Sequence, residues 1–241
     1  MSGGPILPGE PDTATTLVLA RHGRTEHTSG RVLSGAGSDP ALTPAGVEDA
    51  RRLAAAIAAL GGPFGVVEGL GPITRAECSP QRRARQTLDE VVKGTQLEPW
   101  VQEGWREINF GAWDGLSLAE VSARWPEAVR VWFDDPDAAP PGGESIRTMR
   151  ARIAGQVVGT LAANPGEVVL VVSHGGPVAT VVHEALGAGV AALWRMRIDP
   201  CSLTVVRYWP DGGCQVVAVN VTAHLATGPA AEHQVGAAAR L

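Results

Sequence analysis

Two histidines occupy similar places in the sequence. His22 lies in "LARHG" and His174 in "VVSHGG", and each ends an apolar run typical of a buried strand. Because open α/β sheets place their chemistry at the carboxyl ends of strands, both imidazoles could meet at one edge of a sheet. A neutral imidazole is a good nucleophile, although a structural histidine satisfied by backbone hydrogen bonds would give the same local pattern.

Arginines accompany these histidines. Arg21 precedes the first one, and "SPQRRARQT" supplies three more directly after a predicted strand: Arg82, Arg83 and Arg85. The planar fork of a guanidinium suits phosphate oxygens, and helix N-termini predicted at the same edge would add N–H donors. A solvated basic helix face is the alternative interpretation of this segment.

A single acid stands out among apolar and aromatic neighbours. Glu107 lies in "WREINFGAWDG", and loss of water around such a carboxyl raises its pKa toward neutrality. A group of this kind can act as a general acid near neutral pH. The sequence alone equally allows Glu107 to pair with an arginine of the basic helix.

The elements that must position these residues alternate between strands and helices. Strands are expected at 15–20, in "ITRAECSP", "LEPWV" and "EVVLVVSHGG", and as a hairpin in "SLTVVRYWPDGGCQVVAVN". Helices are expected in "LTPAGVEDARRLAAAIAAL", with Thr43 as N-cap and Pro44 first, in "QRRARQTLDEVV", from Gly142–Glu144 to about Leu161, and from Pro177 to about Leu186. The predicted fold class is α/β, with a mainly parallel sheet flanked by helices on both faces.

The domain organisation is simple. The chain has 241 residues, 44% of them hydrophobic, which is enough for one large core. Residues 1–14 are rich in Gly, Pro and acids, and residues 226–241 are rich in small residues without an apolar period. We therefore expect a flexible tail at 1–14, a single domain at 15–225 and a second flexible tail at 226–241.

Charge and cysteine content exclude several classes. With 20 basic and 25 acidic residues the net charge is −5, so we expect neither nucleic acid nor a membrane as partner. Cys78, Cys201 and Cys214 are far apart in the sequence, which gives no zinc motif or disulfide framework and fits a reducing cytoplasm. No H-E-x-x-H spacing and no secretory signal pattern is present, so we expect no metal, no cofactor and a cytoplasmic location.

Five segments, in this order, resemble one known family: "ARHGRTE", "SPQRRARQT", "EINFGAWDG", "PPGGES" and "VVSHGG". They are similar to motifs of the histidine phosphatase superfamily, the phosphoglycerate mutase-like proteins. More narrowly, they resemble its phosphatase branch, which includes alpha-ribazole phosphatases and broad acid phosphatases. The resemblance covers most of the predicted domain and implies a three-layer α/β sandwich.

The resemblance also implies a role for each matching residue. His22 would take the phosphoryl group on a ring nitrogen, and Glu107 would protonate the leaving alcohol and then activate water. The phosphoryl oxygens would be bound by a set of donors: Arg21, Arg83, His174 and the backbone N–H of Gly175. Arg83 is preferred to Arg82 because it stands four residues after Ser79, as in the family's motif.

The sequence departs from the family's pattern at three positions. Thr28 stands where the family usually has an Asn that binds phosphate, and Ser34 followed by Gly35 stands where relatives often carry Thr or Gln and then Gly. Thr28, Ser34 and Gly35 are predicted here as substrate-binding residues. Arg24 replaces what is often Glu, and the sequence gives no reason for this change.

The implied function is a metal-independent phosphomonoesterase acting on a small phosphorylated metabolite. The first alternative is a phosphoglycerate mutase, whose relatives carry a longer, more basic insertion before the "GGES" turn. Here that segment is short, and Arg124 and Arg130 lie among acids and tryptophans. The second alternative, a non-catalytic phospho-ligand-binding module, is disfavoured because the nucleophile, the acid and both clamp residues are all present.

The same segment holds aromatic residues that cover the pocket in relatives: Trp113, Trp125, Trp132 and Phe133. Most tryptophans belong to a core, but their place here suggests a partly apolar leaving group. A homodimer through an exposed edge of the sheet is a further possibility that the sequence leaves open.

Overall fold

The computed structural model describes residues 13–62, 65, 67 and 69–226. The predicted tails lie outside these residues except for Thr13, Ala14 and Ala226, and Ala14 is buried. The division into two tails and one domain stays a prediction. No helix in the described ranges combines the length and the apolar character needed to cross a membrane.

One sheet lies at the centre of the described residues, with the strand order β3-β2-β4-β1-β5-β6. Its strands are β1 (Thr15–Arg21), β2 (Ile73–Cys78), β3 (Pro99–Val101), β4 (Val168–Ser173), β5 (Leu203–Tyr208) and β6 (Cys214–Val221). The pairs β1–β4, β2–β4 and β2–β3 are parallel, whereas β5 runs antiparallel to β1 and to β6. The predicted strands and the terminal hairpin are therefore confirmed.

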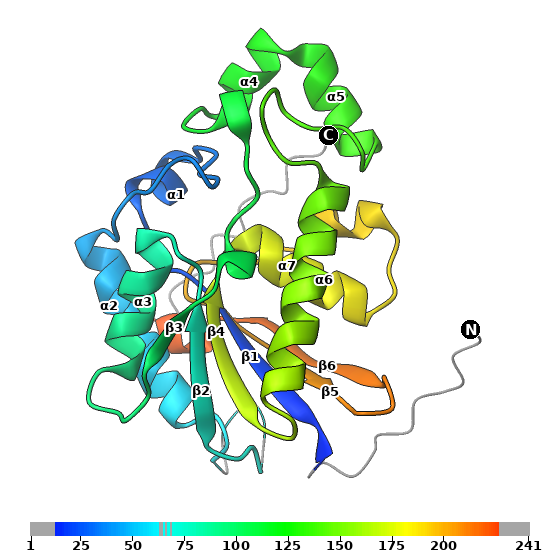
Figure 1. The fold of residues 1–241 in the computed structure, drawn as a ribbon. Coiled ribbons are helices and arrows are strands. Elements are labelled where there is room, and N and C mark those ends of the chain that lie inside the picture. Colours follow the sequence, from blue (N-terminus) through cyan, green and yellow to red (C-terminus); the bar gives the residue numbers. More distant parts are fainter. Residues whose placement is uncertain (1–12, 63–64, 66, 68, 227–241) are drawn as a thin grey trace.

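Helices cover both faces of this sheet, as Figure 1 shows. One face carries α2 (Pro44–Ala58) and α3 (Arg82–Val92), and the other carries α6 (Ile146–Ala163) and α7 (Gly175–Ala185). Successive residues of β1 alternate between the two apolar clusters, because side chains along a strand point to opposite faces. Val18 and Ala20 join the cluster under α2 and α3, while Leu17 and Leu19 join the other. The predicted three-layer α/β fold is confirmed.

Two helix starts show how local sequence sets the boundaries. Thr43 caps α2 as predicted, since its side chain accepts the backbone N–H of Gly46 at 3.0 Å. The start predicted for the next long helix is too early. Gly142 has a φ of 70°, which a helix cannot contain, and Ser145 is the actual N-cap of α6. The "GGES" segment is thus a turn followed by a cap.

The remaining helices are short. They are α1 (Glu26–Gly30), α4 (Leu118–Arg124), α5 (Pro126–Asp134) and the 3-10 turns η2 (Glu103–Trp105), η3 (Gly111–Trp113), η4 (Val190–Arg195) and η5 (Ala223–Leu225). Helices α4 and α5 lie at the top of Figure 1 and form a cover above the sheet. Trp113 and Trp132 are buried within this cover with their rings 5.7 Å apart, so they belong to a core.

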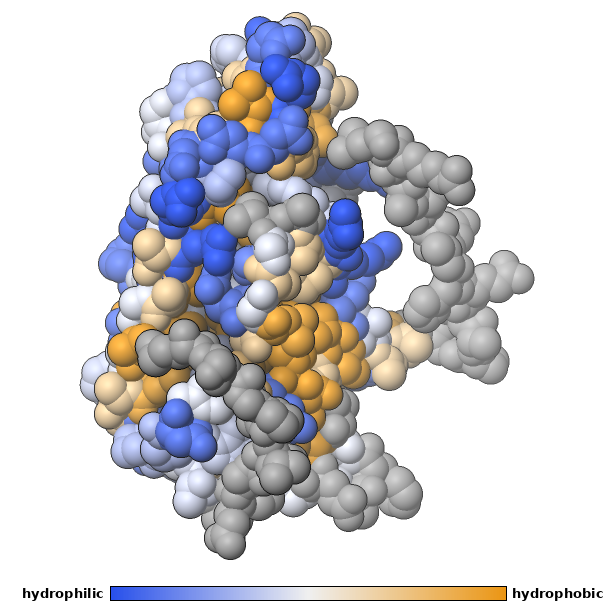
Figure 2. Space-filling model, turned by 90° about the vertical axis from the view of Figure 1, so that its right-hand side faces the viewer, coloured by the Kyte–Doolittle hydropathy of each residue, from blue (hydrophilic) through white to orange (hydrophobic). Residues whose placement is uncertain are grey.

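Both edges of the sheet carry exposed apolar side chains. On β3, Trp100 and Val101 are about half exposed, and on β6 Val219 is 39% exposed. The β6 edge lies on the right of Figure 1, and Figure 2 shows hydrophobic surface on that side of the molecule. The predicted homodimer through an edge stays a prediction.

Candidate active site

The pairing of β1 with β4 brings the two histidines together. Arg21 pairs with Ser173 in the parallel register, so His22 and His174 each follow a paired residue. The backbone N–H of His22 donates to the Ser173 carbonyl at 2.9 Å, and the two imidazole ring centroids are 5.0 Å apart. The carboxyl ends of two neighbouring strands therefore place both rings at one edge of the sheet.

His22 is held in one tautomer by its backbone. Its Nδ1 lies 2.8 Å from the carbonyl oxygen of Gly23, so Nδ1 carries the proton and donates. Its Nε2 accepts a hydrogen bond from Nε of Arg83 at 3.2 Å. Burial lowers the pKa of His22 well below its usual value, and the charges of Arg21 and Arg83 lower it further. The ring is neutral at pH 7, with its lone pair on Nε2.

Arg83 is fully buried beside this lone pair. Its Nη1 donates to the carbonyl of Ser38 at 3.0 Å, and its Nη2 donates to the carbonyls of Ser34 at 2.9 Å and Gly35 at 3.3 Å. Burial lowers the pKa of the guanidinium, while Glu107 opposes that shift. The loop at 34–38 therefore holds the arginine with its Nε toward His22.

The Asp114 carboxylate fixes the 34–38 loop through hydrogen bonds. It accepts the backbone N–H groups of Gly35 at 3.1 Å, Gly37 at 2.8 Å and Ser38 at 3.1 Å, and the Ser38 hydroxyl at 2.5 Å. The Ser34 hydroxyl lies 3.0 Å from that of Ser38. Ser34 and Gly35, predicted as phosphate contacts, thus take part in the site through their carbonyl groups. Sequence reasoning missed Asp114, although it stands in the quoted "FGAWDG".

The two other departures from the family's pattern have structural partners. The Thr28 hydroxyl donates to the Thr25 carbonyl at 2.8 Å and accepts the Thr25 N–H at 2.8 Å, which caps α1. Arg24 forms a two-point ion pair with Asp49 of α2, at 2.5 and 3.0 Å. Thr28 thus completes the capping box of Thr25, the N-cap of α1, and Arg24 connects the loop after β1 to α2.

Arg21 and His174 each carry a buried polar atom without a hydrogen-bond partner in the described residues: Nε of Arg21 and Nδ1 of His174. The other contacts of these side chains fix them in place, since Arg21 Nη1 donates to the Ile198 carbonyl at 2.6 Å and His174 Nε2 lies 2.7 Å from the Ser79 hydroxyl. Burial lowers the pKa of both groups. Several other buried polar atoms of the described residues also lack a hydrogen bond, but these two belong to groups beside His22 and are available to a ligand there.

Glu107 contacts the first turn of α7. This helix begins at Gly175, directly after His174, which is two residues earlier than predicted. The Glu107 carboxylate accepts the N–H of Ile108 at 3.0 Å and the N–H of Gly176 at 3.4 Å. Burial raises the pKa of this carboxyl, and these hydrogen bonds and nearby arginines oppose the rise. The predicted acid is therefore placed beside both histidine strands, with a pKa shifted in the direction that a general acid needs.

A buried ion pair supports the segment that carries Glu107. Arg152 contacts both carboxylate oxygens of Glu144, at 3.0 and 2.7 Å, and its Nη1 donates to the carbonyls of Gly104 at 2.8 Å and Arg106 at 2.9 Å. This pair fixes the backbone directly before the acid. The sequence singled out "PPGGES" as a motif but gave Glu144 no partner.

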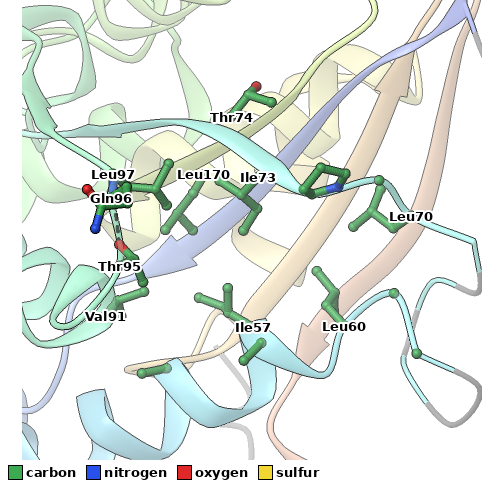
Figure 3. Close-up of a pocket in the computed structure, with 16 residues that line it drawn as sticks. Ile57, Leu60, Leu70, Ile73, Thr74, Val91, Thr95, Gln96, Leu97 and Leu170 are labelled. Atoms are coloured by element: carbon green, nitrogen blue, oxygen red, sulfur yellow. Dashed lines mark hydrogen bonds between the residues drawn. The ribbon is translucent and has the colours of Figure 1, made fainter.

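Two cavities lie in different parts of the molecule. One, of about 260 Å³, borders Gly175 and Gly176 and so adjoins the candidate catalytic residues His174 and Glu107. A larger one, of about 720 Å³, lies between the ends of α2 and α3 and the start of β2, and Figure 3 shows its apolar lining. Because no titratable side chain lines the larger cavity, it is not the candidate active site. In the described part of the chain no cluster of three or more His, Cys, Asp or Glu could hold a metal ion.

Known proteins are similar to this chain over most of its length. It is 35% identical over 217 residues to the bifunctional protein Rv2228c of Mycobacterium tuberculosis, which covers 90% of this chain and 57% of that protein. The chain thus spans little more than half of that relative. It is 34% identical to the 2,3-bisphosphoglycerate-dependent phosphoglycerate mutase of Sinorhizobium fredii over 76% of this chain and 91% of the mutase.

A solved structure shares the fold. The mycobacterial glucosyl-3-phosphoglycerate phosphatase Rv2419c, in a complex with VO3, has a TM-score of 0.71 and 28% identity, over 87% of this chain and 100% of the other. The family model of the histidine phosphatase superfamily (branch 1) matches residues 17–222. This match includes both histidines, Arg83 and Glu107, and the chain therefore belongs to branch 1 of the histidine phosphatase superfamily.

Proposed function

We propose that this chain hydrolyses phosphomonoesters of small metabolites through a phosphohistidine formed on His22, without a metal ion. The observation that carries the proposal is the state of His22, a neutral ring whose Nε2 lone pair faces the buried guanidinium of Arg83. The Arg21 guanidinium lies against Gly175, the residue that follows His174, and the unpartnered Nε of Arg21 and Nδ1 of His174 would bind phosphoryl oxygens. Two similar proteins are named as phosphatases, which supports hydrolysis of a phosphate ester.

In the first step, Nε2 of His22 attacks phosphorus as the ester P–O bond breaks. The leaving oxygen takes the proton of Glu107, whose pKa is raised by burial so that the protonated form persists closer to neutral pH. Arg83 and Arg21 stabilise the charge on the phosphoryl oxygens in the transition state. The Gly23 carbonyl, which accepts from Nδ1, stabilises the positive ring that results.

In the second step, a water molecule attacks phosphorus. The Glu107 carboxylate takes a proton from this water, the N–P bond breaks, and its electron pair returns to Nε2 of His22. Inorganic phosphate leaves, and both catalytic groups return to their starting protonation states. One acid and one nucleophile thus account for every proton and bond in the reaction.

A phosphoglycerate mutase is the competing function, because a mutase is among the similar proteins. The arginines of the covering segment favour hydrolysis instead. Arg124 lies 3.9 Å from Glu120, and Arg130 lies 3.0 Å from Glu127 and 3.8 Å from Asp134. These exposed arginines are paired locally, which leaves them poorly suited to hold a substrate carboxylate. An assay of 3-phosphoglycerate with a bisphosphoglycerate primer separates the two functions.

The decisive experiment is to trap the intermediate. Incubation with a ³²P-labelled phosphomonoester should place acid-labile, base-stable label on His22, and His22→Ala should abolish both labelling and hydrolysis. His224→Ala is the matched control, since that ring contacts the Cys201 carbonyl and is not one of the groups proposed to contact the phosphoryl group. We expect inhibition by vanadate, a mimic of the five-coordinate transition state, and no effect of a chelator. Full hydrolysis by His22→Ala would refute the proposal, and binding without labelling would indicate a non-catalytic module.

A further inference from the structure

The cavity of about 260 Å³ beside the catalytic groups has an unusual lining. Its side chains come from α6, α7 and the segment around η4, and its larger ones are Ile146, Met149, Leu193, Trp194, Met196 and Ile198. The remaining lining residues are Ala179, Gly175 and Gly176. No charged side chain and no hydroxyl or amide side chain is among them, so the side chains that meet an entering group are aliphatic, thioether or aromatic.

Two hydrogen bonds connect this lining to the catalytic groups. Gly176 donates its N–H to Glu107 at 3.4 Å, and Ile198 accepts from Arg21 Nη1 at 2.6 Å through its carbonyl. The cavity therefore begins where the acid stands, which is the side from which the leaving oxygen must receive its proton. A substrate whose phosphoryl group lies on His22 would place its alcohol portion here.

We propose that this cavity selects the leaving group, and that the preferred substrates are phosphomonoesters of alcohols with a compact, uncharged, apolar body. This inference rests on the proposed phosphatase function and adds its substrate class. An apolar space of about 150 Å³ is enough for a benzene ring, so the cavity holds one ring and its attached carbon. A carboxylate or a sugar hydroxyl would lose water there without gaining a partner.

The charged residues near this lining do not supply such a partner. Arg150 is ion-paired with Glu184 at 2.6 Å, and Arg197 with Asp199 at 2.8 Å. Arg195 is exposed and does not line the cavity. This arrangement argues against phosphoglycerates and phosphoserine as favoured substrates, although both are organic phosphates that the phosphoryl clamp itself could hold.

Trp194 forms the rim of the cavity and connects it to the cover. Its ring lies 4.6 Å from that of Trp132 and 4.9 Å from that of Phe133, both in α5, and it is 39% exposed. The apolar leaving-group site thus does not use the predicted Trp113, which is buried. A tryptophan from η4, supported by α5, takes that place.

The test compares two substrates with the same leaving oxygen, cyclohexylmethyl phosphate and 4-carboxycyclohexylmethyl phosphate. We expect kcat/KM to be about tenfold or more higher for the uncharged ester. Trp194→Lys should reduce this ratio by adding a cation at the rim, whereas Trp100→Lys, at an exposed tryptophan of β3, should leave it unchanged. Ala179→Leu fills the cavity and should lower kcat/KM for the cyclohexyl ester while methyl phosphate is still hydrolysed.

Equal kcat/KM for the two esters, or a preference for the carboxylate, would overturn the inference while leaving the proposed function intact. A ratio that Trp194→Lys and Ala179→Leu both leave unchanged, with thermal unfolding showing folded proteins, would place the leaving group elsewhere. Failure of the phosphatase proposal would look different: either His22→Ala would remain active on both esters, or the unsubstituted protein would hydrolyse neither ester and take no label on His22.

Discussion

Gly176 gives a sharp test of how the catalytic acid is held. It is the second residue of α7, and a Cβ added to it would press against Oε1 of Glu107 and lie 3.3 Å from the sulfur of Met149. Its φ is negative, so alanine fits the backbone. We predict that Gly176→Ala displaces the Glu107 carboxylate without disturbing the helix that carries it.

The size of the effect follows from this contact. The carboxylate oxygen must move by about 1 Å to regain ordinary van der Waals separation, and a misplacement of about 1 Å costs roughly 100-fold in rate. That corresponds to about 2.7 kcal/mol in the activation barrier. The loss should appear in the single-turnover rate of His22 phosphorylation by an alkyl phosphate. It should be much smaller with p-nitrophenyl phosphate, whose leaving group departs without a proton.

Gly159 provides the matched control. It lies within α6, a Cβ added to it meets nothing within 4 Å, and the change to alanine is the same. Gly159→Ala should leave the rate unchanged and stabilise the protein by about 0.5–1 kcal/mol, which raises Tm by roughly 1–4 °C. A normal phosphorylation rate in Gly176→Ala, or an equal loss with both substrates, would refute the assigned position of the acid.

Three further predictions concern stability and charge. His22 and His174 are buried with lowered pKa values, so below pH 6.5 the unfolded chain binds protons that the folded protein does not. The free energy of unfolding should therefore fall by up to about 2.7 kcal/mol per pH unit as the pH decreases. In denaturant titrations, His22→Asn should roughly halve this slope. Arg152→Met removes the two-point partner of the buried Glu144 carboxylate, which keeps only Arg106 at 4.0 Å as a cation, and should cost about 3 kcal/mol. Adding Glu144→Gln should restore part of that loss, and additive losses would contradict this. Asp114→Asn removes acceptors from the 35–38 loop, which holds Arg83, and should weaken both vanadate binding and kcat/KM by about tenfold or more. An unchanged affinity for vanadate would show that the loop does not position Arg83 for phosphate binding.

Local patterns predicted the strands and most long helices, although the starts of α6 and α7 were displaced by a few residues. The two "HG" sequences follow apolar runs, so the sequence indicated that His22 and His174 could meet at one sheet edge, and the pairing of β1 with β4 brings them together. The choice of Arg83 over its neighbours depended on the family's spacing after Ser79. In the structure Arg83 is fully buried beside His22, while Arg82 and Arg85 are exposed, which is a distinction that a run of arginines does not show.

The supporting contacts could not be predicted because they join distant segments. Asp114 lies 79 positions from Gly35, and Arg152 lies 48 positions from Gly104. Nothing in the sequence around either residue indicates its partner. For Thr28 the sequence left two roles open, since a hydroxyl near a helix start can bind a ligand or take part in capping. In the structure it completes the capping box of Thr25 at α1, and its predicted contact with substrate stays a prediction.

The peptide group between Ser34 and Gly35 lies between two opposite charges, the Arg83 guanidinium and the Asp114 carboxylate. Its carbonyl faces Arg83 at 2.9 Å and its N–H faces Asp114 at 3.1 Å, so its dipole is aligned between cation and anion. The charges of Arg83 and Asp114 are thus linked through a peptide group rather than by direct contact. Among the described residues the Nη atoms of Arg83 are held by carbonyls, so a phosphate dianion that binds beside them need not displace a carboxylate. A rotation of this one amide plane would move Arg83 and Asp114 together. The orientation of this plane therefore controls how strongly the site binds phosphate.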